Sequence, residues 1–127
     1  MKNKVLTKKQ TEQLATEIFN WLVDNELWVD VCIYFNGKRW RTHDANLKEF
    51  CYNERRYFED EAEPKNYFEY VREPNILSMS FEGGFYEVLN GYVYGWERLE
   101  EEFSKILEKY GLYYELGNAW NLSCYEI

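Results

Sequence analysis

The sequence predicts an α+β domain in which an antiparallel sheet of about five strands packs against two main helices. Two segments, 8–24 and 96–110, carry apolar residues at helical spacing, and two tight-turn dipeptides of Asn and Gly each lie between strand-like runs. No linker or repeat divides the 127 residues, so we expect a single domain over residues 1–127. Short connections indicate antiparallel strands, and we expect the helices to cover one face of the sheet.

The first helix is predicted from about Lys8 to Asp24. Thr7 and Gln10 match a capping box, in which each side chain accepts a hydrogen bond from a backbone N–H at the start of the helix. Its last turn lacks basic residues, so packing of the apolar stripe has to stabilise it. The stripe consists of Leu14, Ile18, Trp21 and Leu22.

A hairpin is predicted over residues 27–42, because Asn36-Gly37 is a strong signal for a two-residue turn. That turn pairs Ile33 with Trp40 and directs one apolar face toward the core. We expect the opposite face to be half-solvated. It carries Asp30, Cys32, Tyr34, Arg39, Arg41 and His43.

Residues 44–74 are the least patterned part of the chain. Asp44 could cap a short helix with apolar residues at helical spacing. The charged stretch 53–64 ends in a proline and suggests an exposed loop or an edge, and 67–71 has strand composition. The apolar residues of the short helix would be Leu47, Phe50 and Cys51.

Residues 76–81 alternate in polarity as a buried strand does, with Leu77, Met79 and Phe81 on one face. Gly83-Gly84 ends this strand. A short helical turn is expected after the two glycines, because three apolar residues follow at helical spacing, and Asn90-Gly91 would be its C-cap. These apolar residues are Phe85, Val88 and Leu89.

The second main helix is predicted from Trp96 to Tyr110. Acidic residues occupy its first turns, lysines its last turn, and Gly111 follows it as the capping residue. A second hairpin over 112–125 is expected to turn at Gly117-Asn118. The apolar stripe of this helix consists of Leu99, Phe103, Ile106, Leu107 and Tyr110.

The net charge is −8, which argues against direct nucleic-acid binding, because such binding needs a basic surface that releases counterions. The three cysteines contain no CxxC pair, so neither a disulfide framework nor a zinc site is expected. The basic N-terminus lacks an apolar signal core, and no window is apolar enough for a membrane span. We therefore expect a protein of the reducing cytoplasm.

No set of residues demands an enzyme, and we expect no catalytic residue, metal or cofactor. His43 is the only histidine, and a nucleophile pair with Cys51 would lack a third, orienting group. Gly83-Gly84 resembles a phosphate-binding turn only weakly, because the surrounding motif is absent and Glu82 and Glu87 would repel phosphate. Acidic pairs such as Glu97 and Glu101 are more typical of solvated helix faces than of hydrolase sites.

Two surfaces are candidates for interaction. One is the outer face of the first hairpin, and the other is formed by two acidic clusters with aromatic residues nearby. The acids of the second cluster lie mainly off the apolar stripe of their helix. The hairpin residues are Tyr34, Arg39 and Arg41. The acidic residues are Glu59, Asp60, Glu61 and Glu63 in the first cluster and Glu97, Glu100, Glu101 and Glu102 in the second.

An acidic surface flanked by aromatic side chains can occupy the cationic nucleic-acid groove of a partner by imitating spaced phosphates. In size and charge the chain resembles small acidic inhibitors carried by phages and plasmids, such as anti-CRISPR and antirestriction proteins. We therefore hypothesise a protein-binding domain whose partner is a basic nucleic-acid-handling enzyme. Two alternatives stay open: a ligand-binding domain or enzyme with an aromatic-lined pocket, and a homo-oligomeric assembly protein, the simplest being a homodimer.

Overall fold

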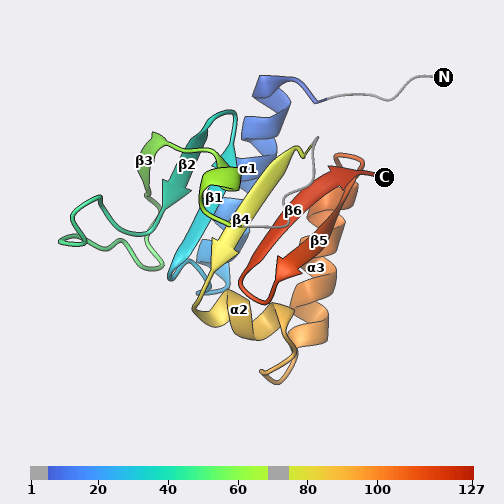
Figure 1. Ribbon diagram of the computed structural model, residues 1–127. Coiled ribbons are helices and arrows are strands. Elements are labelled where there is room, and N and C mark those ends of the chain that lie inside the picture. The colour runs from blue at the N-terminus through green and yellow to red at the C-terminus, as the bar shows by residue number, and fades with distance from the viewer. Residues whose placement is uncertain (1–5, 69–74) are drawn as a thin grey trace.

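The structure is a computed structural model that describes residues 6–68 and 75–127 (Figure 1). A six-stranded antiparallel sheet, in the order β3-β2-β1-β4-β6-β5, packs against two main helices and one short helix. This confirms the predicted α+β class, and the sixth strand comes from the charged stretch expected to be a loop or an edge. The strands are β1 (Val31–Phe35), β2 (Lys38–Arg41), β3 (Phe58–Glu61), β4 (Leu77–Phe81), β5 (Leu112–Asn118) and β6 (Asn121–Glu126). The helices are α1 (Lys8–Asp24), the 3₁₀ helix η1 (Pro64–Asn66), α2 (Gly84–Leu89) and α3 (Trp96–Glu108).

Helix α1 begins and ends where the sequence predicts. Both bonds of the capping box form: Gln10 N–H donates to the Thr7 hydroxyl over 3.0 Å, and Thr7 N–H donates to the Gln10 side chain over 2.9 Å. Trp21 Nε1 donates to Glu102 at 2.9 Å, and Lys109 Nζ donates to Glu17 at 2.6 Å. These contacts set α1 antiparallel to α3, so the end of α1 lies beside the start of α3.

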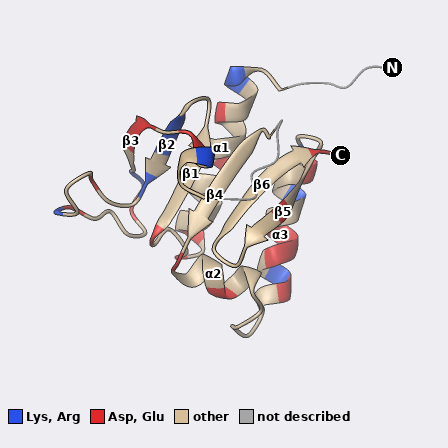
Figure 2. Ribbon diagram, in the orientation of Figure 1, with Lys and Arg blue, Asp and Glu red and all other residues tan. Residues whose placement is uncertain are grey.

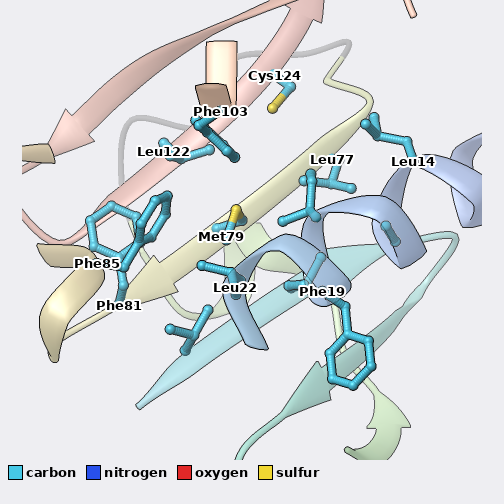
Figure 3. Packing of buried hydrophobic residues seen from close by; sticks show 14 of the residues in the cluster. Leu14, Phe19, Leu22, Leu77, Met79, Phe81, Phe85, Phe103, Leu122 and Cys124 are labelled. Atoms are coloured by element: carbon cyan, nitrogen blue, oxygen red, sulfur yellow. The ribbon is translucent and has the colours of Figure 1, made fainter. Parts of the chain in front are cut away.

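Helices α1, α2 and α3 cover one face of the sheet, and the core fills the space between the two layers (Figures 1 and 3). Leu77, Met79 and Phe81 point from β4 toward the helices, as the alternation predicts, and all three are buried. Large aromatic side chains fill much of this core. The largest fully buried aromatic side chains are Trp28, Trp40, Phe81, Phe85 and Phe103.

The first hairpin has the predicted register, with Ile33 opposite Trp40 and Tyr34 opposite Arg39. The expectation that its outer face is half-solvated is wrong at the centre, where Tyr34 is 3% and Arg39 8% exposed. Ala62 and Phe68 pack on this side of the sheet and form a second small cluster with Tyr34. The segment after β3, which contains η1, therefore covers part of the sheet face that α1, α2 and α3 leave open.

Residues 44–51 do not form the predicted helix. The Asp44 carboxylate accepts hydrogen bonds from the N–H groups of Lys48 (2.7 Å) and Glu49 (3.2 Å), and Leu47 has a positive φ of 58°. A bridge between His43 and Phe50 closes the loop. The side chain of Asp44 thus stabilises a turn instead of the first turn of a helix. Of the predicted strand 67–71, Tyr67 and Phe68 are not in a strand, and 69–71 lie outside the described residues.

The turn of the second hairpin lies two residues later than predicted. Asn118 pairs with Asn121, so Ala119 and Trp120 form the turn, and Gly117 lies at a register shift in β5. The Asn118 side chain accepts hydrogen bonds from Trp120 N–H (3.2 Å) and from Asn121 Nδ2 (2.5 Å). An asparagine that bonds to the backbone two residues on favours this turn.

The predicted short helix is α2, with Asn90 as its C-cap and Gly91 at a φ of 76°. Gly83 precedes it at a point where the backbone passes very close to Val29, in the connection before β1. A Cβ added to Gly83 would lie 2.6 Å from the Val29 carbonyl oxygen. The glycine is explained by this close approach, because any side chain would displace the backbone.

Candidate interaction surface

The basic hairpin pairs with part of the first acidic cluster, above all with Asp60. Strand β3 pairs with β2, and Arg39 donates from Nε (3.0 Å) and Nη2 (2.7 Å) to the two carboxylate oxygens of Asp60. Arg41 adds an ion pair with Asp60 at 3.2 Å. The Arg39 hydrogen bonds lower the pKa of Asp60. In Figure 2 the acidic β3 lies directly beside the basic β2.

The other acids of this cluster differ in their surroundings. Glu59 accepts a 2.8 Å hydrogen bond from Trp40 Nε1 and lies 3.7 Å from Lys38 Nζ. Glu61 and Glu63 are exposed. Arg39 also stacks over the ring of Tyr67, 4.7 Å from its centroid. Two of the predicted surfaces, the basic hairpin face and the first acidic cluster, are therefore largely partners of each other.

The acids of α3 divide into two pairs. Glu102 accepts hydrogen bonds from Trp21 Nε1 (2.9 Å) and from Arg98 (2.9 Å). The bond from Trp21 is the main cause of the lowered pKa of Glu102. Glu100 accepts from Ser104 (3.0 Å) and from Tyr114 (2.8 Å). Both carboxylates thus hold α3 to its neighbours. Glu97 and Glu101 are exposed instead.

Sequence reasoning missed a third acidic group, which we call the acidic end. The C-terminus of α1, the start of β1, the end of β4 and the starts of α2 and α3 all lie at one end of the domain (Figures 1 and 2). Glu82 N–H donates to the Asp30 carbonyl at 3.1 Å, which joins two of these segments. These acids are spread over two connecting loops and two helices, so they form no charge run in the sequence. The exposed acids of this end are Glu26, Asp30, Glu82, Glu87 and Glu97.

The carboxylates of the acidic end make no ion pair with a described basic residue. Within the described residues, no side-chain ion pair is made by Glu82, Glu87 or Glu97, whereas Arg98 is already paired with Glu102 at 2.9 Å. Asp30 accepts a 2.6 Å hydrogen bond from the Tyr52 hydroxyl, and burial together with this bond raises the pKa of Tyr52 to about 12. Glu26 lies in the turn that follows α1 and has a positive φ of 59°.

The loop between α2 and α3 adds exposed aromatic surface to the acidic end. Tyr92 is 71% exposed, and Tyr94 is fully exposed. Tyr92 N–H donates to the Glu87 carbonyl at 2.8 Å, which fixes the loop beside α2. Tyrosines among carboxylates suit a partner with Lys or Arg side chains, which can contact both the rings and the charges.

The side chains considered for catalysis have structural roles. His43 Nδ1 lies 3.0 Å from the Asp44 carbonyl oxygen, and the buried Cys51 thiol lies 3.5 Å from the Thr42 carbonyl oxygen. Burial raises the pKa of Cys51, which disfavours the nucleophilic thiolate. Among the residues that the structure describes, no group of three His, Cys, Asp or Glu side chains is placed to hold a metal ion.

No protein-family model matches this chain, and the comparisons with curated proteins and with solved structures also found no match. No helix in the described parts, 6–68 and 75–127, is long and apolar enough to cross a membrane.

Proposed function

We propose that this protein is a non-enzymatic binding domain that recognises a basic protein through its acidic end. Five exposed carboxylates gather there from two connecting loops, α1–β1 and β4–α2, and from helices α2 and α3, and the α2–α3 loop with its two exposed tyrosines lies at the same end (Figures 1 and 2). This convergence is the observation that carries the proposal. Such a surface combines long-range attraction for a cationic partner with aromatic contact area.

In its sharpest form, the proposal is an inhibitor of a nucleic-acid-handling enzyme. The carboxylates would occupy the cationic groove that otherwise binds phosphates, and Tyr92 and Tyr94 would take the place of stacked bases. The net charge of −8 supports attraction to such a groove at long range. The acids of β3 contribute less, because Asp60 and Glu59 are engaged within the domain.

The test is affinity capture from a host lysate with the immobilised full chain, followed by identification of the bound proteins. We expect basic nucleic-acid-binding proteins, released by about 0.3 M salt because screening shortens the range of the attraction. Added DNA or RNA should compete for the same proteins. Retained proteins that are acidic, or that resist both salt and nucleic acid, would contradict the proposal.

Two double charge reversals of equal net charge locate the binding surface. Glu87→Lys with Glu97→Lys changes the acidic end, and Glu61→Lys with Glu63→Lys changes exposed acids near β3. Capture should fail with the first variant and persist with the second. Equal loss in both would mean that overall charge, rather than the acidic end, determines binding.

A further inference from the structure

The two edge strands of the sheet differ in how they are protected. Strand β3 is short, with the sequence Phe-Glu-Asp-Glu, and charges of this kind prevent pairing with another chain. Strand β5, at the opposite edge, runs from Leu112 to Asn118 and is apolar or aromatic at four of its seven positions. A long edge of this composition readily accepts a further strand.

The hydrogen-bond pattern shows which backbone groups of β5 face outward. Ile127 N–H donates to the Gly111 carbonyl at 2.9 Å, directly across from it in the register. Bonding residues alternate along an antiparallel ladder, so positions 113 and 115 also bond to β6. Leu112, Tyr114 and Leu116 therefore direct their N–H and C=O groups to the outer edge. Apart from β6, none of the strands in the described residues pairs with β5.

The same three residues border an apolar groove of about 490 Å³ between β5 and α3. Leu107 of α3 and Leu112 are buried at its base, and Leu116 is 41% exposed at its rim. In Figure 1, β5 ends the sheet on the side where α3 lies behind it. A strand added to β5 would place alternate side chains over this groove, as strand addition requires.

The charges around the groove identify the chemistry of its occupant. Glu100 and Glu108 border it on the α3 side, and none of the described residues that line it is Lys or Arg. A second copy of the chain, added about a two-fold axis, would bring these glutamates toward their equivalents. A cationic segment would meet them with opposite charge.

We infer that the outer edge of β5 binds an extended segment of a basic partner protein as a seventh strand. Apolar side chains of that segment enter the groove, and Lys or Arg side chains at flanking positions reach Glu100 and Glu108. The inference rests on the proposed function only in requiring a basic protein partner, because it concerns another surface of the domain.

The test uses a capped peptide of about seven residues, the length of an ordinary strand. Valines at its two central groove-facing positions enter the groove, lysines at its first and last positions lie on the same face toward Glu100 and Glu108, and threonines occupy the other positions. Its control is the same peptide N-methylated at alternate residues, which keeps the charge and removes the edge-facing N–H donors. Binding is measured by titration calorimetry. We expect the control to bind about tenfold more weakly, since several net hydrogen bonds are lost. In amide hydrogen exchange, the unmodified peptide should protect Leu112, Tyr114 and Leu116.

The protein-side variant is Leu116→Pro, which removes one outward N–H, with Leu116→Val as the matched control. Leu116→Pro should weaken the unmodified peptide about tenfold and Leu116→Val by less than about twofold. If Leu116→Pro fails to fold, the two peptides still decide the question on the unaltered protein. Equal binding of both peptides, or no binding, would overturn the inference.

Two further outcomes separate this inference from its alternatives. A dimer of the free protein in sedimentation equilibrium, dissociated by Leu116→Pro, would assign the edge to a second copy and overturn it. Glu87→Lys with Glu97→Lys should leave the difference between the two peptides unchanged. Failure of the peptide test with capture still dependent on Glu87 and Glu97 would leave the proposed function standing alone.

Discussion

The acids of β3 and those of the acidic end carry the same charge in different surroundings. On β3, Asp60 accepts two hydrogen bonds from Arg39 and lies 3.2 Å from a second guanidinium, that of Arg41. At the acidic end, Glu87 and Glu97 are exposed and make no ion pair with another described residue. One group therefore stabilises the fold, and the other is available to an external cation.

This difference follows from the positions of the elements in the sheet. Strand β3 lies in register with the basic strand β2, so a run of acids is opposed by a run of bases. At the acidic end, by contrast, the segments that meet bring acids together without an opposing run of bases. A charge cluster in the sequence is thus a poor guide to a charged surface, because strand pairing can cancel one run with another.

The largest effect on stability is expected in the core, on the inner face of α3, rather than among the exposed acids. Phe103 is fully buried under α3 and packs against Phe85, with ring centroids 5.2 Å apart. Phe103→Ala should lower the free energy of unfolding by about 3–5 kcal/mol, because it removes buried contacts and leaves a cavity. Urea unfolding measures this. Stability equal to that of the unaltered protein would mean that the inner face of α3 is wrongly assigned.

The next largest effect is expected at Arg39, whose pairing with Asp60 on β3 contributes to stability. Arg39→Met keeps most of the apolar stem but leaves Asp60 without its bidentate partner and removes the cation over Tyr67. The free energy of unfolding should fall by about 2–3 kcal/mol, less than for a fully buried pair because Asp60 is partly exposed. Thermal and urea unfolding should agree, and a loss below about 0.5 kcal/mol would contradict the role assigned to this pair.

The pH dependence of stability distinguishes the same pair from the exposed acids. The folded-state pKa of Asp60 is lowered by its hydrogen bonds from Arg39, so its contribution is complete above the unfolded pKa of about 3.9 and is lost as pH falls through the folded pKa. Between pH 7 and pH values below about 4, the unaltered protein should therefore lose more stability than Asp60→Asn does. Glu102 makes the same pH-dependent contribution to stability in the unaltered protein and in Asp60→Asn. Parallel curves would show that the pair contributes nothing.

The smallest effect is expected at the exposed tyrosines. Tyr94→Ala, alone or with Tyr92→Ala, should change the free energy of unfolding by less than about 0.5 kcal/mol per residue, because these side chains bury little surface. The same variants should weaken capture of the basic partner. A large loss of stability would assign the α2–α3 loop to the core instead of the binding surface.

Local signals in the sequence predicted most elements of the fold. The capping box at Thr7 and Gln10 marked the start of α1, and Asn36-Gly37 fixed the register of the first hairpin. The prediction of local structure was wrong where one side chain could stabilise either of two backbone conformations. Asp44 closes a turn rather than capping a helix, and Asn118 moves the second turn by two residues.

The candidate site was predictable only in part. Glu97 and Glu101 were identified correctly as outward-facing acids, but Glu100 and Glu102 accept hydrogen bonds from residues on β5 and α1. The burial of Arg39 depends on residues that follow β3, more than twenty positions away, and the acidic end depends on the meeting of five elements. Tertiary contacts of this kind have no local signature in a single sequence.

The most direct measurement compares the unfolding free energies of two single charge reversals, Asp60→Lys and Glu97→Lys. Asp60→Lys places a third cation beside Arg39 and Arg41 and should cost at least about 2 kcal/mol. Glu97→Lys should change stability by less than about 0.5 kcal/mol. Equal losses in the two variants would contradict the division between acids that stabilise the fold and acids that are free to bind a partner.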